Sequence, residues 1–269
     1  MKNTLVDVNW LSQNIHRSDI VILDATQASK KADLPEGITD QQIPGALPFD
    51  IKNNFSDPNS SLPNTMPSPS HFEKESCKLG INDTTTIVVY DDYGIYFSPR
   101  VWWMYKVMGH NKVVVLNGGF TAWIEANQPT ENKTKHQSLP GNFTANFNSH
   151  LIKTYDDIIA NISSNESLLI DARSSGRFQG IVPEPRAGML SGHIPNSENL
   201  PYTTVLENGK YKSKQAIQLL FDELPINDKP LIFSCGSGIT ACIILLAHEL
   251  IGGGDKMLYD GSWTEWVER

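Results

Sequence analysis

The chain has 269 residues, of which 39% are hydrophobic and 9% aromatic, as is typical of a folded protein with room for two domains. Its formal net charge of −8 argues against a general nucleic-acid-binding protein, because such proteins need clustered lysine and arginine. The chain has three cysteines, an odd number that does not suggest a disulfide framework. No spacing of cysteines and histidines is typical of a zinc site, so we expect no metal.

The N-terminal segment, residues 1–19, has neither the continuous apolar core nor the small-residue cleavage site of a signal peptide. The longest aliphatic run, "ACIILLA" at 241–247, is far too short to span a bilayer. We therefore expect a cytoplasmic protein that uses no membrane, in a reducing compartment that keeps its cysteines as thiols.

Three short runs rich in β-branched residues mark the first half of the chain, at 19–24 (DIVILD), 86–91 (TIVVYD) and 112–117 (KVVVLN). A helical pattern, "SPRVWWMYKVMG" at 98–109, follows the second run and ends at a glycine. Apolar runs without polar alternation are typical of parallel strands that helices cover on both faces.

The second half has the same kind of runs, at 167–172 (SLLIDA), 230–235 (PLIFSC) and 256–260 (KMLYD). Its helical pattern is "GITACIILLAHELIG" at 238–252. The alternation predicts an α/β fold in which each domain has a mostly parallel sheet flanked by helices. In such sheets, ligands bind beyond the carboxyl ends of the strands.

An internal repeat relates the two halves. Four pairs of segments match in the same order: 21–25 (VILDA) with 168–172 (LLIDA), 43–50 (IPGALPFD) with 194–202 (IPNSENLPY), 79–91 (LGINDTTTIVVYD) with 224–235 (LPINDKPLIFSC), and 116–123 (LNGGFTAW) with 259–266 (YDGSWTEW). The last pair needs no gap, because its members lie 143 positions apart throughout. We predict domains over 1–126 and 151–269, joined by a polar linker over 127–150.

Cys235 lies at the end of a predicted strand and opens the loop "CGSGIT", which leads into a helix. Backbone N–H groups in such a loop can converge on an anion, and the same field stabilises a thiolate. From the residues alone, a catalytic cysteine and a buried structural thiol are equally open. We expect Cys77 and Cys242, which lie in helical patterns, to be packing residues.

The first copy of the repeat has Asp91 where the second has Cys235. A carboxylate can sit in a cradle of N–H groups, but it cannot accept a sulfur atom. We therefore predict that the first domain is non-catalytic and that the second carries the chemistry.

Three arginines, Arg173, Arg177 and Arg186, occur in the glycine- and proline-rich stretch before the cysteine strand. A guanidinium binds a carboxylate through two parallel donors, so two of these arginines could orient an α-keto acid. The alternative is that they form ion pairs with nearby carboxylates, for which the candidates are Asp171, Glu184 and Glu198.

Two other readings of this region are weaker. A cysteine phosphatase needs an arginine at the sixth position after its cysteine, and Ala241 stands there. His193 is a candidate base, but we expect it to hydrogen-bond the turn that it begins.

At these residues the chain resembles the tandem rhodanese-domain sulfurtransferases, and within them the branch that uses 3-mercaptopyruvate. The resemblance covers nearly the whole chain and depends on five motifs: "PRVWWM", "GRFQGIVPEPRAG", "SGHIPNSENLPY", "SCGSGITA" and "LYDGSWTEW". It implies two tandem rhodanese-like domains. The thiosulfate-using branch has basic residues in the cysteine loop, whereas the loop of this chain has no charge.

The resemblance implies a role for each matching residue. Cys235 looks like the nucleophile that becomes a persulfide, and Ser237 like the loop serine that helps to transfer protons. Arg177 and Arg186 look like the substrate-binding arginines, whereas Arg173 matches less well. The rest of the active-site loop is Gly236, Gly238, Ile239 and Thr240.

One feature departs from the family pattern. Some relatives have a histidine and an aspartate in the segment that matches 49–67, as partners of the loop serine. This chain has no histidine there, and Thr65 falls near the expected position. Asp50 and Asp57 are the available carboxylates. We therefore expect Ser237, water and backbone N–H groups to handle the proton.

The function implied is sulfur transfer from 3-mercaptopyruvate through Cys235 to a thiol, cyanide or thioredoxin, with release of pyruvate. It needs no metal or organic cofactor, and its partners are the small-molecule donor and acceptor. Two alternatives stay open: a thiosulfate:cyanide sulfurtransferase, and a non-catalytic module that relays sulfur for a partner.

Overall fold

A computed structural model describes residues 4–27, 40–133, 138–186 and 188–269. Of the predicted linker, residues 134–137 lie outside the described residues. The same holds for residues 1–3 and 28–39 in the predicted first domain, and for Ala187 in the motif "GRFQGIVPEPRAG".

The chain forms two compact units. The first unit comprises Met1–Pro58, Met66–Phe147 and Asn208–Tyr211, and the second comprises Asn59–Thr65, Asn148–Glu207 and Lys212–Arg269. Two short segments therefore belong to a unit other than the one that surrounds them in the sequence. One of them, Asn59–Thr65, brings residues from the first half of the chain into the second unit.

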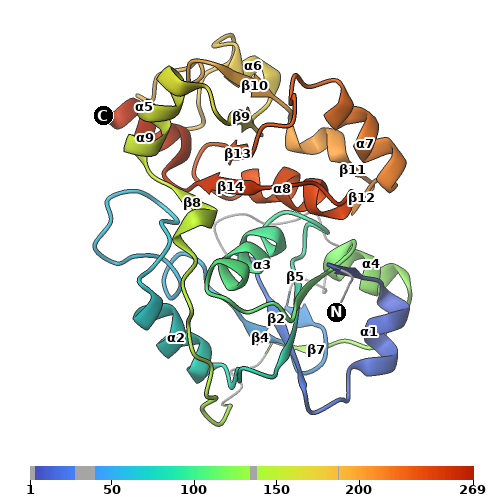
Figure 1. Ribbon diagram of the computed structural model, residues 1–269. Helices are drawn as coiled ribbons and strands as arrows, with labels where there is room; N and C mark the ends of the chain where they lie inside the picture. The colour runs from blue at the N-terminus through green and yellow to red at the C-terminus, as the bar shows by residue number, and fades with distance from the viewer. Residues whose placement is uncertain (1–3, 28–39, 134–137, 187) are drawn as a thin grey trace. The chain divides into compact units, whose positions relative to one another are not determined.

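A five-stranded parallel sheet forms the centre of the first unit (Figure 1). Its strands, in spatial order, are β1 (Leu5–Val6), β6 (Val113–Leu116), β5 (Thr86–Tyr90), β2 (Ile20–Asp24) and β4 (Leu47–Pro48). The central strand β5 is buried at every position, which explains its run of apolar residues without alternation.

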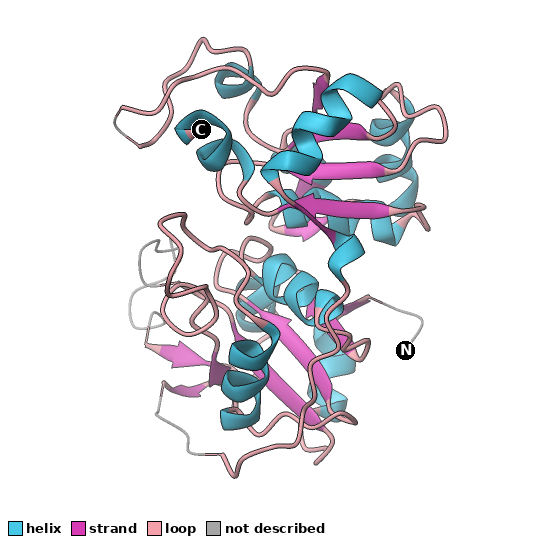
Figure 2. Ribbon diagram, turned by 60° about the vertical axis from the view of Figure 1, so that its left-hand side comes forward, coloured by secondary structure: helices cyan, strands magenta, loops and turns pink. Residues whose placement is uncertain are grey.

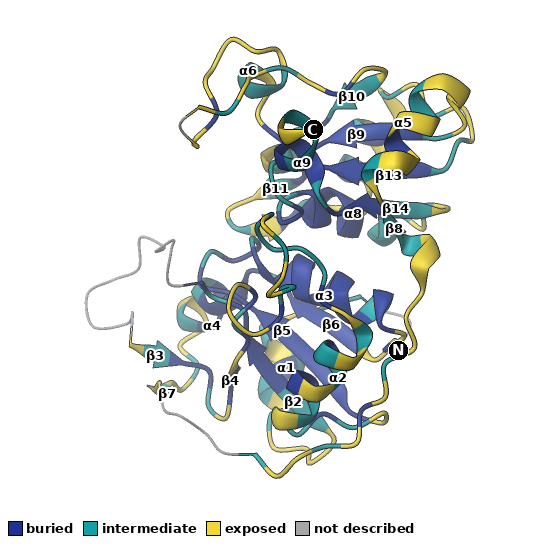
Figure 3. Cartoon of the chain, turned by 90° about the vertical axis from the view of Figure 1, so that its left-hand side faces the viewer, coloured by how far each residue is buried: buried dark blue, intermediate teal, exposed yellow. Residues whose placement is uncertain are grey.

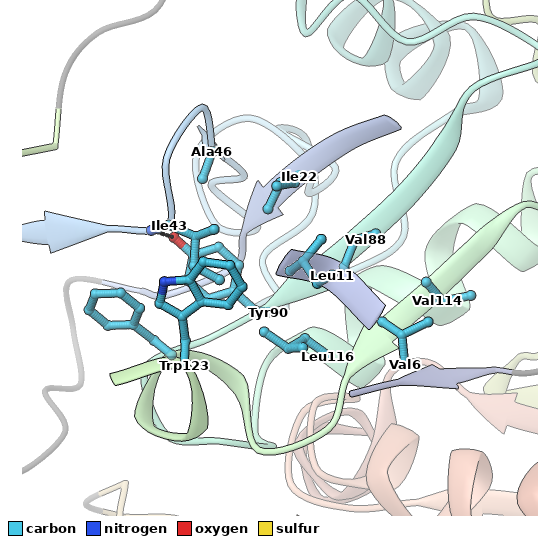
Figure 4. Packing of buried hydrophobic residues seen from close by; sticks show 11 residues of the cluster. Val6, Leu11, Ile22, Ile43, Ala46, Val88, Tyr90, Val114, Leu116 and Trp123 are labelled. Atoms are coloured by element: carbon cyan, nitrogen blue, oxygen red, sulfur yellow. Dashed lines mark hydrogen bonds between the residues drawn. The ribbon is translucent and has the colours of Figure 1, made fainter. Parts of the chain in front are cut away.

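Helices flank this sheet (Figure 2). They are α1 (Val8–Asn14), α2 (Pro69–Lys78), α3 (Ser98–Val107) and α4 (Gly119–Glu125). Leu11 of α1 and Trp123 of α4 pack with Val88 and Val114 of the sheet in one apolar cluster (Figure 4). This cluster covers one face of the sheet. Neighbouring side chains of a strand point to opposite faces, and helix α3, which contacts β5 and β6, covers the second face.

The second unit repeats this arrangement. Its parallel sheet has the spatial order β8 (Ile152–Lys153), β14 (Lys256–Tyr259), β13 (Leu231–Ser234), β9 (Leu168–Asp171) and β10 (Ser197–Asn199). Each strand occupies the place of its counterpart in the first sheet. The predicted α/β fold with two parallel sheets is therefore confirmed.

The helices of the second unit are α5 (Tyr155–Ser164), α6 (Ser175–Phe178), α7 (Lys214–Asp222), α8 (Ala241–Leu250) and α9 (Ser262–Glu268). Ile158 of α5 and Trp263 of α9 pack on one face of the sheet with Ile232. Helix α8 packs against β13, β14 and α7, and its first eight residues are buried (Figure 3). This burial explains why the sequence of α8 is apolar on every side.

Local sequence sets the ends of α5. Thr154 accepts a hydrogen bond from the Asp157 N–H at 3.3 Å, and the Asp157 carboxylate accepts one from the Thr154 N–H at 2.8 Å. This reciprocal pair is a capping box. The helix ends at Asn165, which adopts a left-handed conformation (φ 53°) that asparagine tolerates.

The remaining elements are small. The strands β3 (Gln41–Gln42) and β7 (Glu131–Asn132) form an antiparallel pair, β11 (Leu206–Glu207) and β12 (Lys210–Tyr211) form another two-stranded sheet, and two 3-10 turns occur at Ser149–Leu151 and Tyr202–Val205. Across the described ranges, no helix combines the length and the apolar character that crossing a membrane would require.

A buried histidine makes the second unit sensitive to acid. His248 of α8 is 7% exposed, and its ring lies 5.1 Å from that of Phe221 and 5.9 Å from that of Phe233. Burial, assisted by the charge of Lys256, lowers the pKa of His248 from 6.5 to about 4. The unfolded chain therefore binds a proton at a pH where the folded chain does not, and stability falls as pH drops below 6.5.

We expect His248→Phe to remove this acid sensitivity. Between pH 7 and pH 5 the unfolding free energy of the variant should fall by roughly 1–2 kcal/mol less than that of the parent chain. Urea unfolding at the two pH values measures this difference. The exposed His150, replaced by glutamine, is the control, and equal slopes for the parent and His248→Phe would contradict the prediction.

Candidate active site

Cys235 follows β13 directly and is 1% exposed. Its N–H donates to Ser262 Oγ at 3.3 Å, and its carbonyl accepts from the Trp263 N–H at 2.9 Å. Both backbone groups of the cysteine are thus bound to the start of α9. These two hydrogen bonds hold the backbone of Cys235 between β13 and the start of α9.

The loop after Cys235 is held in one conformation. Gly238 has φ +77°, in the left-handed region that favours glycine. The Gly236 carbonyl accepts two hydrogen bonds from Thr264, one from its N–H at 3.0 Å and one from its Oγ1 at 2.7 Å. Cys242 Sγ donates to the Gly238 carbonyl at 3.4 Å. The thiol of Cys242 therefore has the packing role that the sequence predicted.

The last two residues of the loop begin helix α8. Ile239 is 8% exposed, and its carbonyl accepts from the Cys242 N–H at 3.1 Å. Thr240 precedes the first helical residue, and its side chain makes no capping hydrogen bond. Within the described ranges, no three histidine, cysteine, aspartate or glutamate side chains are grouped to hold a metal ion.

In the first unit, the loop that corresponds to the cysteine loop begins at Asp91 and surrounds its carboxylate with backbone N–H groups. Asp91 directly follows β5, and its carbonyl accepts from the Phe120 N–H at 3.0 Å, as that of Cys235 accepts from Trp263. Its carboxylate accepts hydrogen bonds from four backbone N–H groups at 2.8–3.0 Å, those of Tyr93, Tyr96, Phe97 and Ser98. The predicted cradle of N–H groups around Asp91 is confirmed.

Arg177 of α6 lies against the loop of the second unit. A Cβ atom added to Gly236 would stand 3.2 Å from Arg177 Nη2. The guanidinium bonds the Glu184 carboxylate through Nε at 3.1 Å and through Nη2 at 2.5 Å. The side chain is 24% exposed. Since a guanidinium has two edges, the edge formed by Nη1 and Nη2 is left to face a ligand.

Arg173 is a different kind of residue. It is 1% exposed and donates to the Asp171 carboxylate at 2.6 Å, to Glu184 at 2.7 Å and to the Gly192 carbonyl at 2.7 Å. Its guanidinium also stacks 4.3 Å from the centre of the Trp263 ring. All three guanidinium nitrogens thus donate inside the unit, so Arg173 forms the ion pairs that were the alternative for these arginines, as Arg177 also does with Glu184.

Arg186 reaches the loop through Thr264. Its Nη1 donates to Thr264 Oγ1 at 3.4 Å, and the same hydroxyl donates to the Gly236 carbonyl at 2.7 Å. No carboxylate of the described residues lies within ion-pair distance of Arg186. The structure thus joins one cation without an ion-pair partner to the backbone of the cysteine loop.

The sequence interpretation missed Thr264. It lies 143 positions after Thr121, whose Oγ1 donates to the Asp92 carbonyl at 3.1 Å in the first unit. Asp92 and Gly236 both come directly after the residue that opens the loop. The recurrence of threonine in the ungapped part of the repeat was the signal that could have identified this contact.

The hydrogen-bond partner of Ser237 is Asn64, which lies in Asn59–Thr65, the segment from the first half of the chain that belongs to the second unit. Asn64 Nδ2 donates to Ser237 Oγ at 3.1 Å, and it lies 3.4 Å from the Ser237 carbonyl oxygen. Thr65, which falls near the position of the histidine in some relatives, donates instead through Oγ1 to the Leu62 carbonyl at 3.1 Å.

The remaining candidates have local roles. Asp50 accepts hydrogen bonds from the N–H and the side-chain amide of Asn53, and both Asp50 and Asp57 belong to the first unit. His193 Nδ1 lies 3.0 Å from the Phe178 carbonyl, and the two rings stack 4.2 Å apart. The role of the histidine is structural, as expected, but its hydrogen-bond partner is in α6 and not in the turn around His193.

A cavity in the first unit involves none of the predicted site residues. It has a volume of about 400 Å³, and its lining includes Asp7, Asn117 and Lys210. Lys210 Nζ lies 3.8 Å from the Glu125 carboxylate at its rim. The lining residues of this cavity include no cysteine and no residue of the loop that Cys235 opens.

Known proteins resemble this chain along its whole length. The model of the rhodanese-like domain matches it twice, at residues 7–126 and 154–269. The 3-mercaptopyruvate sulfurtransferase of Mus musculus is 40% identical, over 98% of this chain and 92% of its own. The thiosulfate sulfurtransferase of Rattus norvegicus is 38% identical over the same shares.

Two solved structures are similar to it. SseA from Escherichia coli, a structure of the 3-mercaptopyruvate sulfotransferases with the rhodanese fold, superimposes with a TM-score of 0.85 and 34% identity, over 97% of this chain and 99% of its own. Tum1 from Saccharomyces cerevisiae gives a TM-score of 0.86 and 32% identity, over 100% and 96%.

Proposed function

Since this chain belongs to the sulfurtransferases with two rhodanese-like domains, we propose that it transfers sulfur from 3-mercaptopyruvate through a persulfide on Cys235 and releases pyruvate. The acceptor is a thiol, cyanide or thioredoxin. We assign this chemistry to the second domain, 151–269, and a non-catalytic role to the first, 1–126, which has Asp91 in place of the cysteine.

The observation that carries the proposal is the match between the Asp91 and Cys235 loops. The first loop directs four backbone N–H groups at an anionic side chain, and the second opens with a cysteine whose carbonyl accepts a hydrogen bond in the same way as that of Asp91. N–H groups at the start of α8, together with the dipole of this helix, would stabilise negative charge that develops on the sulfur during the reaction. They would equally stabilise the negative terminal sulfur of a persulfide.

Two arginines supply the charge for the substrate carboxylate. Arg177 has one guanidinium edge on Glu184 and the other edge available, and Arg186 has no carboxylate partner among the described residues. The mercaptopyruvate anion offers a carboxylate and a keto oxygen side by side, which suits paired donors. Holding this substrate in place replaces orientation entropy that would otherwise oppose the reaction.

The reaction has two steps. The Cys235 thiolate attacks the sulfur of mercaptopyruvate, an S–S bond forms, and the C–S bond breaks with its electron pair going to carbon as the enolate of pyruvate. The enolate takes a proton from Ser237 or water, and the thiol proton leaves the new persulfide. An acceptor thiolate then attacks the outer sulfur, which restores the Cys235 thiolate.

The loop chemistry supports mercaptopyruvate over thiosulfate as donor. Relatives of both names match at nearly the same identity, so the choice depends on the loop itself. Residues 236–240 carry no charge, and thiosulfate is a compact dianion that basic residues inside the loop would suit better. A carboxylate held by arginines outside the loop needs no such residues.

Single-turnover mass spectrometry tests the proposal. The chain is mixed with one equivalent of either donor, and the peptide that contains Cys235 is examined for a gain of about 32 Da, the mass of one sulfur atom. We expect the gain with mercaptopyruvate and a higher kcat/KM for it than for thiosulfate. The reverse ratio would identify a thiosulfate sulfurtransferase, and no gain with either donor would refute the proposal. A persulfide that never passes to small thiols would indicate a relay module.

We expect Arg186→Ala to raise KM for mercaptopyruvate about tenfold or more, with a smaller change in kcat, because a hydrogen bond to a charged group contributes about 1.5–3 kcal/mol. Steady-state kinetics measures this split. The exposed Arg17, which pairs with Asp19 in the first unit, provides the control variant Arg17→Ala. An unchanged KM in Arg186→Ala would remove Arg186 from the substrate site.

The proposal places the enzyme in the cytoplasm. Cys77, Cys235 and Cys242 are thiols and not disulfides in the structure, and a reducing compartment would preserve the nucleophile between turnovers.

A further inference from the structure

We propose that Asn64 is a positioning residue for Ser237: its carboxamide, which does not itself titrate, directs the serine hydroxyl hydrogen toward the substrate. This inference rests on the proposed sulfur transfer, in which the leaving enolate needs a proton. It concerns a segment, Asn59–Thr65, that precedes the second domain by more than eighty residues and yet forms part of the second unit.

The direction of the hydrogen bond carries the inference. Asn64 Nδ2 faces Ser237 Oγ at 3.1 Å and the Ser237 carbonyl oxygen at 3.4 Å. A carbonyl oxygen can only accept, so the amide presents its NH₂ group, not its oxygen, to this residue. The serine oxygen is therefore an acceptor toward Asn64, and its own hydrogen points elsewhere. Among the residues that the structure describes, none accepts that hydrogen.

The backbone of Asn64 is suited to this task. It has φ +58°, in the left-handed region that asparagine adopts more readily than most residues. Hydrogen bonds within the same turn hold it in place: the Leu62 N–H donates to Ser60 Oγ at 3.1 Å, and the Ser60 and Thr65 hydroxyls lie 2.9 Å apart. The turn thus presents the amide to the cysteine loop as a fixed group.

A carboxamide does not ionise in the physiological range, so it orients the serine equally well across that range. The titratable or charged groups beside the loop include, among the described residues, Cys235, Arg177, Arg186, Glu184 and Tyr202. None of these side-chain types has an ordinary pKa near 6.5. Asn64 should therefore add no ionisation of that kind to proton delivery to the enolate.

A double-mutant cycle tests the positioning role, with single-turnover pyruvate release as the readout. Asn64→Gly removes the amide without backbone strain, because glycine accepts φ +58°. We expect it to lower the rate about 3–10-fold at saturating mercaptopyruvate, and to have no further effect in a Ser237→Ala background. Asn165→Gly, at another left-handed asparagine of the second unit, is the matched control and should leave the rate unchanged.

The pH profile provides a readout that a merely structural role would not change. The parent chain should show no break near pH 6.5, and Asn64→His should introduce one, because its imidazolium donates to Ser237 as the amide does whereas the neutral ring can take the serine hydrogen. Additive effects in the cycle, or a break near pH 6.5 in the parent chain, would overturn the inference. The proposed function would still stand in that case, provided that the persulfide forms on Cys235. A parent chain that forms no persulfide would overturn the proposed function as well.

Discussion

Cys235→Ser should abolish sulfur transfer, with a fall in kcat/KM of about 10⁴-fold or more. The hydroxyl occupies nearly the same volume as the thiol, but its pKa is too high for ionisation in a cradle of neutral N–H groups, and it forms no stable bond to the sulfane sulfur. Because Cys235 is 1% exposed and its backbone carries the contacts with Ser262 and Trp263, the fold should be retained. Transfer of sulfur from mercaptopyruvate to cyanide or dithiothreitol measures the loss.

The two other cysteines supply controls for this experiment. Cys77 is partly exposed in the first unit, and Cys77→Ser should keep full activity. Cys242 is buried beside the loop, where its thiol donates to the Gly238 carbonyl. Cys242→Ser can keep that hydrogen bond, so it should lose far less activity than Cys235→Ser. Comparable losses in Cys242→Ser would mean that the nucleophile has been assigned to the wrong thiol.

The repeat made the fold predictable from the sequence. Two sets of apolar runs in the same order require two sheets with the same strand order, and the pairing of β5 with β2 and β6 has its counterpart in the pairing of β13 with β9 and β14. The equivalence of Asp91 and Cys235 was also accessible, because both residues directly end the central strand of their copy. Local pattern was sufficient for these conclusions.

The partners of the site residues were less accessible. Asn64 lies 173 positions from Ser237, and the seven residues of its turn, 59–65, have no pattern that indicates which unit the turn will join. Arg173 and Arg177 stand four residues apart in one irregular stretch, and the sequence alone could not tell the buried ion pair from the exposed donor. That distinction depends on where Glu184 and Trp263 lie once the second unit has folded.

The second large effect is expected at Arg173. Replacing it with methionine keeps most of the side-chain volume but leaves the buried Asp171 carboxylate without its cation, and Glu184 with Arg177 alone. Removing one partner of a buried ion pair costs about 3–5 kcal/mol, because the remaining charge stays out of water. We therefore expect Arg173→Met to destabilise the second unit by that amount.

Hydrogen exchange is the appropriate measurement, since the two units need not unfold together. Amides of β9 and β13 in Arg173→Met should exchange through openings that require about 3–5 kcal/mol less than in the parent chain, while those of β2 and β5 in the first unit should be unchanged. The double variant Arg173→Met/Asp171→Asn is the decisive companion, because it removes the stranded carboxylate and should recover part of the loss. Equal protection of β9 in all three chains would mean that this network makes no net contribution to the unfolding free energy, as is the case for some buried ion pairs. The role of Arg173 would then be to hold Glu184 in place for Arg177.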